Sequence, residues 1–139
     1  MGIEITKVTG DEELQLVFAI RRTVFVDEQC CPPELEWEFE DESIHFLARH
    51  DGQPAGAARW RRTEKGYKLE RFAVLKEFRG MGVGQALVKA VLADLPADAQ
   101  YIYLHAQVPA MGLYSKLGFV AEGNQFEEAG ILHYKMVLY

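Results

Sequence analysis

The most informative part of this sequence is the run Arg79-Gly80-Met81-Gly82-Val83-Gly84, called the glycine loop below. It lies between a β-like run, Leu69 to Val74, and an amphipathic helical run, Val83 to Leu95. Alternate glycines let the backbone turn sharply and direct successive N–H groups into one concavity. The helix that begins there adds its free amide donors and the positive end of its dipole. The loop therefore predicts a site for the pyrophosphate of a nucleotide-like cofactor.

Two common phosphate-binding motifs are excluded by the residues that follow the glycines. A Walker loop needs a Lys and a Ser or Thr after its last glycine, whereas Gln85 and Ala86 follow Gly84. A dinucleotide-binding fingerprint needs a further glycine, which neither Gln85 nor Leu87 supplies. The remaining pattern is Arg-x-x-Gly-x-Gly at a strand-to-helix turn.

Hydrophobic periodicity predicts strands and helices on both sides of the glycine loop. Strands are expected at Ile3 to Val8, Ser43 to His50, Ala55 to Arg62, Tyr67 to Val74, Tyr101 to Ala106 and His133 to Leu138. Helices are expected from Gly10-Asp11 onward, from Val83 until Pro96, and from Pro109 to Gly118. After Pro32-Pro33 the pattern favours either a short helix or an extended segment.

Three motifs in a fixed order carry a family resemblance. They are Leu69-Glu70-Arg71-Phe72-Ala73-Val74, the glycine loop, and Gln107-x-x-Ala110-x-x-Leu113-Tyr114-x-x-Leu117-Gly118-Phe119. Together they resemble the GCN5-related N-acetyltransferases, the GNAT superfamily, over essentially the whole chain. The resemblance implies one α/β domain, residues 1–139, with a mixed, mostly antiparallel twisted sheet and helices on both faces. The implied element order is β-α-α-β-β-β-α-β-α-β-β.

In this superfamily the acetyl donor is acetyl-CoA, so the resemblance assigns cofactor-binding residues. Those implied for CoA are Phe72, Ala73, Val74, Arg79, Gly80, Met81, Gly82, Val83, Gly84, Gln85 and Gln107, the last in place of the usual Asn. Backbone groups of Phe72 and Val74 would pair with the pantetheine arm as with an added strand. The amide of Phe72 or a neighbour would face the thioester oxygen and stabilise the oxyanion.

The resemblance also implies two catalytic side chains. Tyr114 corresponds to the general acid that protonates the departing thiolate, and a phenol is protonated at neutral pH. The alternative is a tyrosine that packs on the helix with its hydroxyl in water. Glu70 is the candidate general base; it alternates with Arg71 along a strand, so only one of the two should face the site. Competing bases are His45, Glu28, His105 and an ordered water relay.

A second set of residues resembles small single-domain bacterial acetyltransferases of unassigned substrate. It assigns the acceptor side to Arg21, Glu28, His45 and His133, in a pattern that also includes Phe25, Gln29 and Glu128. Arg21 lies on an apolar helix stripe and needs a buried acceptor, and Glu28 lies two turns further along that stripe. This pair forms either a wall of the acceptor pocket or a structural ion pair.

Acidic residues are concentrated in Glu34 to Glu42, called the acidic segment below. Beside an acceptor pocket, they would attract a cationic amine such as a polyamine, an aminoglycoside or a lysine side chain. The alternative is a solvated surface that keeps Leu35, Trp37 and Phe39 inward.

Composition limits the remaining possibilities. With 139 residues, 49% of them hydrophobic, the chain is long enough for one domain with a core, and its net charge of −6 argues against nucleic-acid binding. No segment approaches the roughly 20 apolar residues of a membrane span, and no apolar signal region is seen, so we expect a cytoplasmic protein without membrane contact. Cys30 and Cys31 are adjacent, which favours reduced thiols with a packing role, and no metal site is predicted.

The expected reaction is acetyl transfer from acetyl-CoA to a primary amine of a small molecule or peptide, by direct attack in a ternary complex. No cysteine lies near the predicted centre in sequence, so no acyl-enzyme is expected. Two alternatives remain open: a CoA-binding sensor or interaction module without turnover, and an N-acyltransferase for longer acyl chains. The protein is expected to be a monomer or a homodimer.

Overall fold

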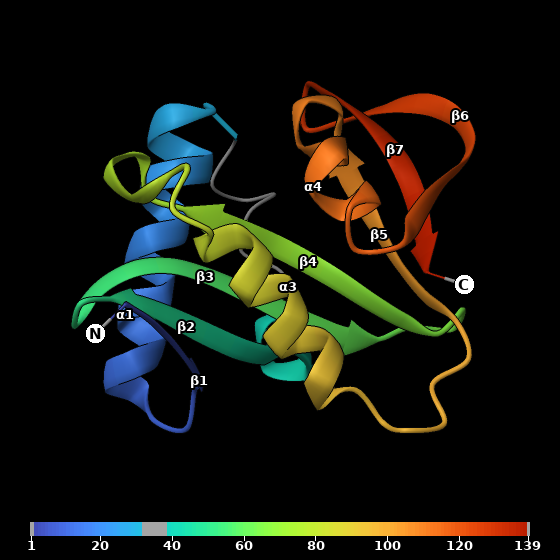
Figure 1. Cartoon of the computed structure of the whole chain (residues 1–139). Helices are drawn as coiled ribbons and strands as arrows, with labels where there is room; N and C mark the ends of the chain where they lie inside the picture. Colours follow the sequence, from blue (N-terminus) through green and yellow to red (C-terminus); the bar gives the residue numbers. More distant parts are fainter. Residues whose placement is uncertain (1, 32–38, 139) are drawn as a thin grey trace.

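A mixed sheet forms the centre of the computed structural model, which describes residues 2–31 and 39–138. Within these residues seven strands form one sheet in the order β1-β2-β3-β4-β5-β7-β6 (Figure 1). The strands are β1 (Ile3–Lys7), β2 (Ile44–His50), β3 (Gln53–Arg62), β4 (Tyr67–Val74), β5 (Ile102–Gln107), β6 (Phe119–Glu128) and β7 (Ile131–Leu138). Each neighbouring pair is antiparallel except β4 and β5, which are parallel. The predicted mixed, mostly antiparallel sheet is confirmed.

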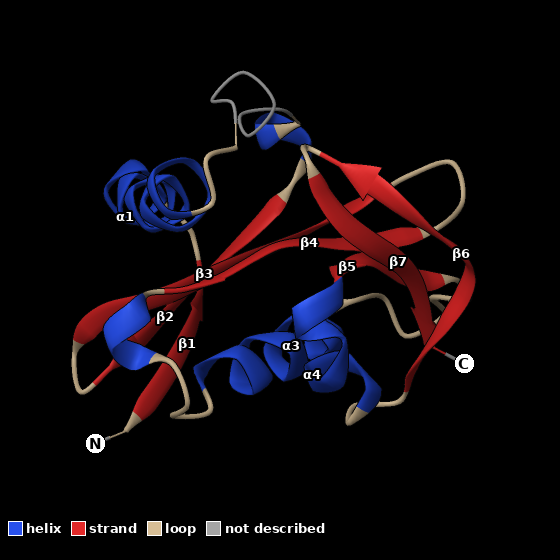
Figure 2. Cartoon of the chain, turned by 90° about the horizontal axis from the view of Figure 1, so that it is seen from above, coloured by secondary structure: helices blue, strands red, loops and turns tan. Residues whose placement is uncertain are grey.

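Helices cover both faces of this sheet, as predicted (Figure 2). On one face α1 (Asp11–Arg21) continues directly into η1 (Arg22–Glu28), a π-helical segment. On the other face lie α3 (Val83–Asp94) and α4 (Met111–Ser115). Three short 3-10 helices, η2 (Glu40–Glu42), η3 (Lys76–Phe78) and η4 (Val108–Ala110), also occur among the described residues.

Two apolar cores follow from the alternation of side chains along the central strands. Leu47 of β2 packs with Val17 and Ile20 of α1 in one core. Its neighbour Phe46 packs with Leu87 and other residues of α3 in the second, larger core. Both faces of the sheet are therefore buried, which positions the two helical layers relative to the strands between them.

Several predicted boundaries differ from the observed ones. The third strand begins at Gln53 rather than Ala55, because Pro54 pairs with Arg49 beside a register shift. The last strand begins at Ile131, before the predicted His133. The helix expected from Pro109 consists of η4 and the short α4. The helix or extended segment expected after Pro32-Pro33 falls on residues 32–38, which lie outside the described residues.

The two parallel strands stay together only at one end. β4 pairs with β5 through Tyr67–Leu69 and residues 102–104. Beyond Leu69, β4 keeps its pairing with β3 up to Val74, and β5 keeps its pairing with β7 up to Gln107. The strands separate in this region, as Figure 1 shows. Two strand edges therefore face each other without pairing among the described residues.

A β-bulge interrupts β4 where this separation begins. The register with β3 shifts there, so Ala58 lies opposite two residues, Arg71 and Phe72. Arg71 has a φ of 57°, in the left-handed region that non-glycine residues rarely adopt. The extra residue breaks the alternation of side chains, so the prediction that Glu70 and Arg71 face opposite sides is wrong: both line the same pocket.

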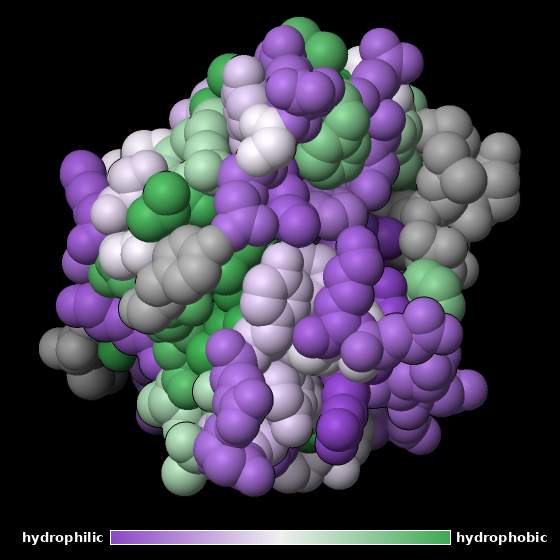
Figure 3. All heavy atoms as spheres, turned by 90° about the vertical axis from the view of Figure 1, so that its right-hand side faces the viewer, coloured by the Kyte–Doolittle hydropathy of each residue, from purple (hydrophilic) through white to green (hydrophobic). Residues whose placement is uncertain are grey.

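The surface is mostly polar, with scattered apolar side chains. Figure 3 shows hydrophilic side chains over much of the face that lies on the right of Figure 1. Val120 and Leu132 are among the large apolar residues that are about half exposed. Among the described residues, no helix has the length and apolar character needed to cross a membrane.

Candidate active site

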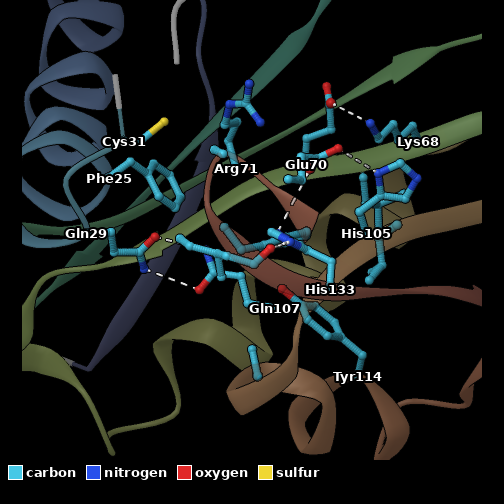
Figure 4. A pocket seen from close by; sticks show the side chains of 17 residues that line it. Phe25, Gln29, Cys31, Lys68, Glu70, Arg71, His105, Gln107, Tyr114 and His133 are labelled. Atoms are coloured by element: carbon cyan, nitrogen blue, oxygen red, sulfur yellow. Dashed lines mark hydrogen bonds and ion pairs between the residues drawn. The ribbon is translucent and has the colours of Figure 1, made fainter. Parts of the chain in front are cut away.

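A pocket of about 340 Å³ opens where β4 and β5 separate (Figure 4). Its walls come from η1 and the residues after it, from β4, β5 and α4, and from the turn between β6 and β7. Of the residues predicted for the site, those that line the pocket are Glu70, Phe72, Gln107, Tyr114 and His133. Those outside its lining include Arg21, Glu28, His45 and the residues of the glycine loop.

The glycine loop leads from η3 into the N-terminus of α3. Gly80 and Gly82 have φ values of +79° and +89°, conformations that favour glycine. The first hydrogen bond inside α3 joins the Ala86 amide to the Gly82 carbonyl at 3.0 Å, so the preceding amides have no acceptor within the helix. A Cβ at Gly80 would meet no atom within 4 Å, which leaves the loop backbone accessible. These features fit an anionic group such as the pyrophosphate of CoA.

The side chains of this region contribute little to such a site. Met81 and Gln85 are exposed, whereas Val83 and Ala73 are buried in the two cores, so only their backbone groups remain for a ligand. Gly84 has a packing role, since a Cβ there would lie 3.3 Å from Leu113 of α4.

Arg79 of the glycine loop forms a bidentate ion pair with Glu28 of η1. The guanidinium donates to both carboxylate oxygens of Glu28, at 2.6 and 2.8 Å, and to the Val74 carbonyl at 2.9 Å. The hydrogen bond from Arg79 lowers the pKa of Glu28. The predicted pairing of Glu28 with Arg21 is therefore wrong, because Glu28 turns toward the glycine loop.

Arg21 instead forms a bidentate pair with Glu40 of η2, with both distances at 2.8 Å. Arg59 of β3 donates to the same carboxylate at 3.0 Å, and His45 Nε2 lies 3.2 Å from the Glu40 backbone carbonyl. Arg21, His45 and Arg59 are all buried. This arrangement supports the structural alternative for Arg21 and places His45 outside the pocket lining.

The acidic segment is described only in part, because residues 34–38 lie outside the described residues. Its Glu40 points inward to Arg21 and Arg59, while Asp41 and Glu42 are exposed. The alternative interpretation is wrong for Phe39, which it expects inward and which is 41% exposed. A place for the segment beside an acceptor pocket stays a prediction.

Tyr114 projects from α4 with its side chain almost completely buried. Its ring packs edge-on against Phe72 and Phe119, with centroids 5.8 and 6.1 Å away. Burial raises the pKa of Tyr114 above its ordinary value, so the phenol is protonated at neutral pH. In Figure 4 the ring points from α4 toward the region between Gln107 and His133.

Gln107 is held in place across the pocket by Gln29. The two amides exchange hydrogen bonds, at 2.9 Å from Gln107 to Gln29 and 3.4 Å in the reverse direction (Figure 4). Gln107 ends β5 and Gln29 follows η1, so this contact joins the two sides of the separated sheet. It supplies a specific partner for the glutamine that replaces the usual asparagine.

Glu70 lines the pocket but is surrounded by cations. Arg59, Arg61 and Lys68 lie 2.9, 2.8 and 3.2 Å from its carboxylate. Burial alone would raise the pKa of Glu70, but the charge of Arg59 and the hydrogen bond from Arg61 outweigh it and lower the pKa to about 2. So weak a base accepts a proton from an amine poorly, and these contacts argue against the predicted role of Glu70.

Two histidines and a glutamate meet at the other wall. His105 Nδ1 lies 3.3 Å from one carboxylate oxygen of Glu128, and His133 Nε2 lies 4.0 Å from the other. The hydrogen bond with His105 lowers the pKa of Glu128. Phe126 stacks on the His133 ring with a centroid distance of 5.7 Å. All three titratable residues line the pocket.

The chain as a whole is similar to known proteins. Residues 5–139 match the family described as the acetyltransferase (GNAT) domain. The chain belongs to this family. Among its relatives, the uncharacterized N-acetyltransferase YjcF of Bacillus subtilis is 40% identical over 131 residues, which cover 92% of this chain and 94% of YjcF. The GNAT family indicates an acyl-CoA-dependent acetyltransferase.

Solved structures show the same fold. ElaA of Escherichia coli is 24% identical with a TM-score of 0.83, and 99% of each chain is covered. An acyl-CoA N-acyltransferase of Pseudomonas aeruginosa is 27% identical with a TM-score of 0.81, again over 99% of each chain. The separated β4 and β5 strands therefore belong to a GNAT fold.

Several residues of this GNAT pocket were not predicted for the site from sequence. Phe25 and Cys31 reach it from η1 and the residues after it, and Lys68 and Arg71 reach it from β4. Cys31 was expected only to pack, and its distance in sequence from the predicted centre gave no sign of its place on the pocket wall. For Phe25 the signal was its position in the second set of residues; for Arg71 it is the bulge, which periodicity does not reveal.

Proposed function

We propose that this chain transfers the acetyl group of acetyl-CoA to a primary amine by direct attack in a ternary complex. The observation that carries the proposal is the position of Tyr114 and Gln107 in the pocket where β4 and β5 separate. The exposed backbone of the glycine loop, at the N-terminus of α3, supplies a matching site for the CoA pyrophosphate.

The donor site proposed here is largely a backbone site. The edge of β4 from Phe72 to Val74 does not pair with β5 among the described residues, so an extended ligand can bind along it, although the Val74 carbonyl already accepts a hydrogen bond from Arg79. Pantetheine bound along this edge places its thioester in the pocket. The Phe72 amide, next to the bulge, then supplies a hydrogen bond to the developing oxyanion.

Tyr114 is the proposed proton donor to the departing sulfur. Its phenol is protonated at neutral pH, and its position against Phe72 places it beside the proposed thioester site. Tyr114 is almost completely buried and lines the pocket, which disfavours the alternative of a surface tyrosine with its hydroxyl in water.

A thiol-release assay tests the proposal. Free CoA is measured with a thiol reagent while acetyl-CoA is offered with a panel of cationic, neutral and anionic amines. The proposal expects release that depends on one class of amine, with the acetylated amine detected by mass spectrometry. Binding of acetyl-CoA by calorimetry without release from any amine would instead support a binding module.

Cys31 requires its own control, because it lies on the pocket wall. If the amine attacks acetyl-CoA directly, Cys31→Ser should keep wild-type turnover and no acetyl-cysteine should accumulate. A burst of CoA in the absence of amine, lost in Cys31→Ser, would replace direct attack by an acyl-enzyme route.

A second candidate is transfer of a longer acyl group. It is favoured by the pocket volume of about 340 Å³ and by similarity to the Pseudomonas aeruginosa acyl-CoA N-acyltransferase. The same assay with octanoyl-CoA distinguishes acetyl transfer from transfer of a longer acyl group. Acetyl transfer predicts a lower kcat/KM for octanoyl-CoA than for acetyl-CoA. Transfer of a longer acyl group predicts a higher kcat/KM for octanoyl-CoA.

A further inference from the structure

His133 is a buried titratable group in the pocket for which the proposed reaction has given no role. It lies on β7 between Gln107 of β5 and Phe126 of β6, which are its partners in the sheet register. Its side chain is nearly buried, yet it lines the pocket. Figure 4 shows it on the side of the pocket toward which Tyr114 points. The acceptor amine still requires a base, and the position of His133 suits that role.

The tautomer of His133 is determined by a backbone contact. Its Nδ1 lies 2.7 Å from the Ile131 carbonyl oxygen, which can only accept a hydrogen bond. Nδ1 therefore carries the hydrogen, and in the neutral ring the lone pair is on Nε2. Among the described residues no hydrogen bond engages Nε2; the Glu128 carboxylate lies 4.0 Å away. His133 thus offers an oriented basic nitrogen within the pocket lining.

The Glu128 carboxylate is a charged group beside that nitrogen. The hydrogen bond between His105 Nδ1 and a Glu128 carboxylate oxygen, 3.3 Å long, lowers the pKa of Glu128. The Glu128 carboxylate is therefore ionised at neutral pH. A negative charge beside Nε2 stabilises the imidazolium that forms when a proton is accepted. The Ile131 carbonyl orients the ring and Glu128 stabilises its charge, as in a base with a supporting acidic partner.

We infer that His133 is the general base of the transfer reaction, a step that rests on the proposed function. As the neutral amine forms its N–C bond to the thioester carbon, the carbonyl π electrons move to oxygen and Nε2 takes one N–H proton. The oxyanion then reforms the carbonyl, the C–S bond breaks, and the sulfur takes the Tyr114 proton. Transfer of the imidazolium proton to the tyrosinate through water restores both groups, so one proton and one acetyl group have moved in total.

The other candidate bases are engaged elsewhere. Glu70 is neutralised by Arg59, Arg61 and Lys68. Glu28 is held by Arg79, and His45 lies outside the pocket lining. His105 has its Nδ1 directed to Glu128 and is the only remaining competitor among the described residues named as bases.

Several ionisable groups face His133 and enter its pH dependence. They are Glu128 from β6, His105 from β5, Lys68, Glu70 and Arg71 from β4, and Tyr114 from α4, with Cys31 on the opposite wall. Of these, only the histidines have an ordinary pKa between the carboxylates and the thiol. An acidic limb that is lost on replacing one of these histidines therefore reports that histidine.

The test compares pH profiles of kcat/KM with acetyl-CoA and the amine that releases most CoA. His133→Gln is expected to lower kcat by roughly 10²-fold and to remove the acidic limb, while acetyl-CoA affinity by calorimetry stays at the wild-type value. His105→Gln is expected to keep the acidic limb, and His50→Gln, a substitution outside the pocket, is expected to leave both kcat and the pH profile unchanged.

Glu128→Gln is expected to move the acidic limb to lower pH, because the imidazolium loses its charged neighbour. Its matched control is Glu127→Gln, an exposed neighbour on the same strand.

A separate measurement needs no acceptor. Nitrogen chemical shifts of the labelled imidazole rings report the tautomer, and the inference expects hydrogen on Nδ1 of neutral His133. Hydrogen on Nε2 of neutral His133 would overturn the inference. So would wild-type turnover by His133→Gln. Loss of the acidic limb in His105→Gln, with the limb kept in His133→Gln, would also overturn it. If His133→Gln fails to fold, the shift of the limb in Glu128→Gln decides. Absence of turnover by the wild-type chain with every amine overturns the proposed function and this step together, whereas the outcomes above overturn this step alone.

Discussion

Tyr114 is a buried tyrosine that lines the pocket. Phe72 and Phe119 surround the ring, so the side chain has little freedom to move. The same burial raises the pKa of its phenol, which keeps the proton available in any neutral assay. At this scale the structure shows a packed, buried tyrosine rather than a surface one, and its role as proton donor is the proposal to be tested.

Tyr114→Phe tests that role, because it keeps the ring and removes only the hydroxyl. We expect kcat to fall roughly 10²-fold, with acetyl-CoA affinity nearly unchanged, in single-substrate titrations of CoA release. Tyr103→Phe is the control: its hydroxyl bonds Thr63 at 2.8 Å and it lies outside the pocket lining, so kcat should not change. Wild-type turnover by Tyr114→Phe would assign the proton to water or to another group.

Among the elements, η1 explains why the predicted pair of Arg21 and Glu28 does not form. In an α-helix residues seven apart lie on the same side, since each residue advances about 100°. The π-helical segment widens each turn, as the bond from the Gln29 amide to the Val24 carbonyl at 3.1 Å shows. Glu28 therefore points toward Arg79, and Phe25 reaches the pocket.

The glycine loop is the element that should bind the donor phosphates. Gly82→Ala adds one methyl group where the backbone must approach the ligand, at a left-handed residue. Calorimetry should show CoA binding at least about tenfold weaker, a loss of about 1.4 kcal/mol. Gly52→Ala is the matched control. Gly52 has a φ of +86°, against +89° for Gly82, and a Cβ at Gly52 would meet no atom within 4 Å.

Both variants share the cost of a left-handed alanine, about 1 kcal/mol of stability. Thermal unfolding should therefore show similar losses for the two, while only Gly82→Ala loses CoA affinity. Equal CoA affinity in both variants would remove the glycine loop from the donor site.

On the scale of the whole molecule, charged side chains join α1, η2, β3 and β4 near the pocket. Glu40 binds Arg21 from α1 and Arg59 from β3, and Glu70 binds Arg59, Arg61 and Lys68. Burying charges is unfavourable unless each finds partners, so removal of one carboxylate leaves an uncompensated cation. Stability should depend on these carboxylates staying ionised.

Glu70→Gln tests this dependence through urea unfolding at several pH values. At neutral pH we expect it to lower the free energy of unfolding by about 3–5 kcal/mol, because Arg59 loses its buried partner. The pKa of Glu70 is about 2 in the folded chain against an ordinary 4.5, so the contribution of its charge is complete above the ordinary value. It is lost as the pH falls from 4.5 toward 2, and the difference between wild type and variant should narrow over that range. A constant difference, or an equal effect of the exposed Glu64→Gln, would contradict this account.

The sequence by itself determined the features that depend on local patterns. Alternating and helical periodicity predicted the main helices and the strands other than β6, for which no range was predicted, and alternate glycines before an apolar helical face predicted the turn at Gly82. The order of its motifs indicated the GNAT fold, which the observed sheet and helices confirm. These features are local because each follows from backbone conformation and side-chain spacing within one segment.

Tertiary structure alone decided which side chains meet. The bulge at Arg71 turns it and Glu70 into one pocket, and cations from three positions then remove the basicity of Glu70. The partners of His133, by contrast, are Ile131 at the start of β7 and Glu128 at the end of β6. Hydrogen bonds and charges act over a few ångströms in space, whatever the separation along the chain, so these roles appear only when the strands are assembled.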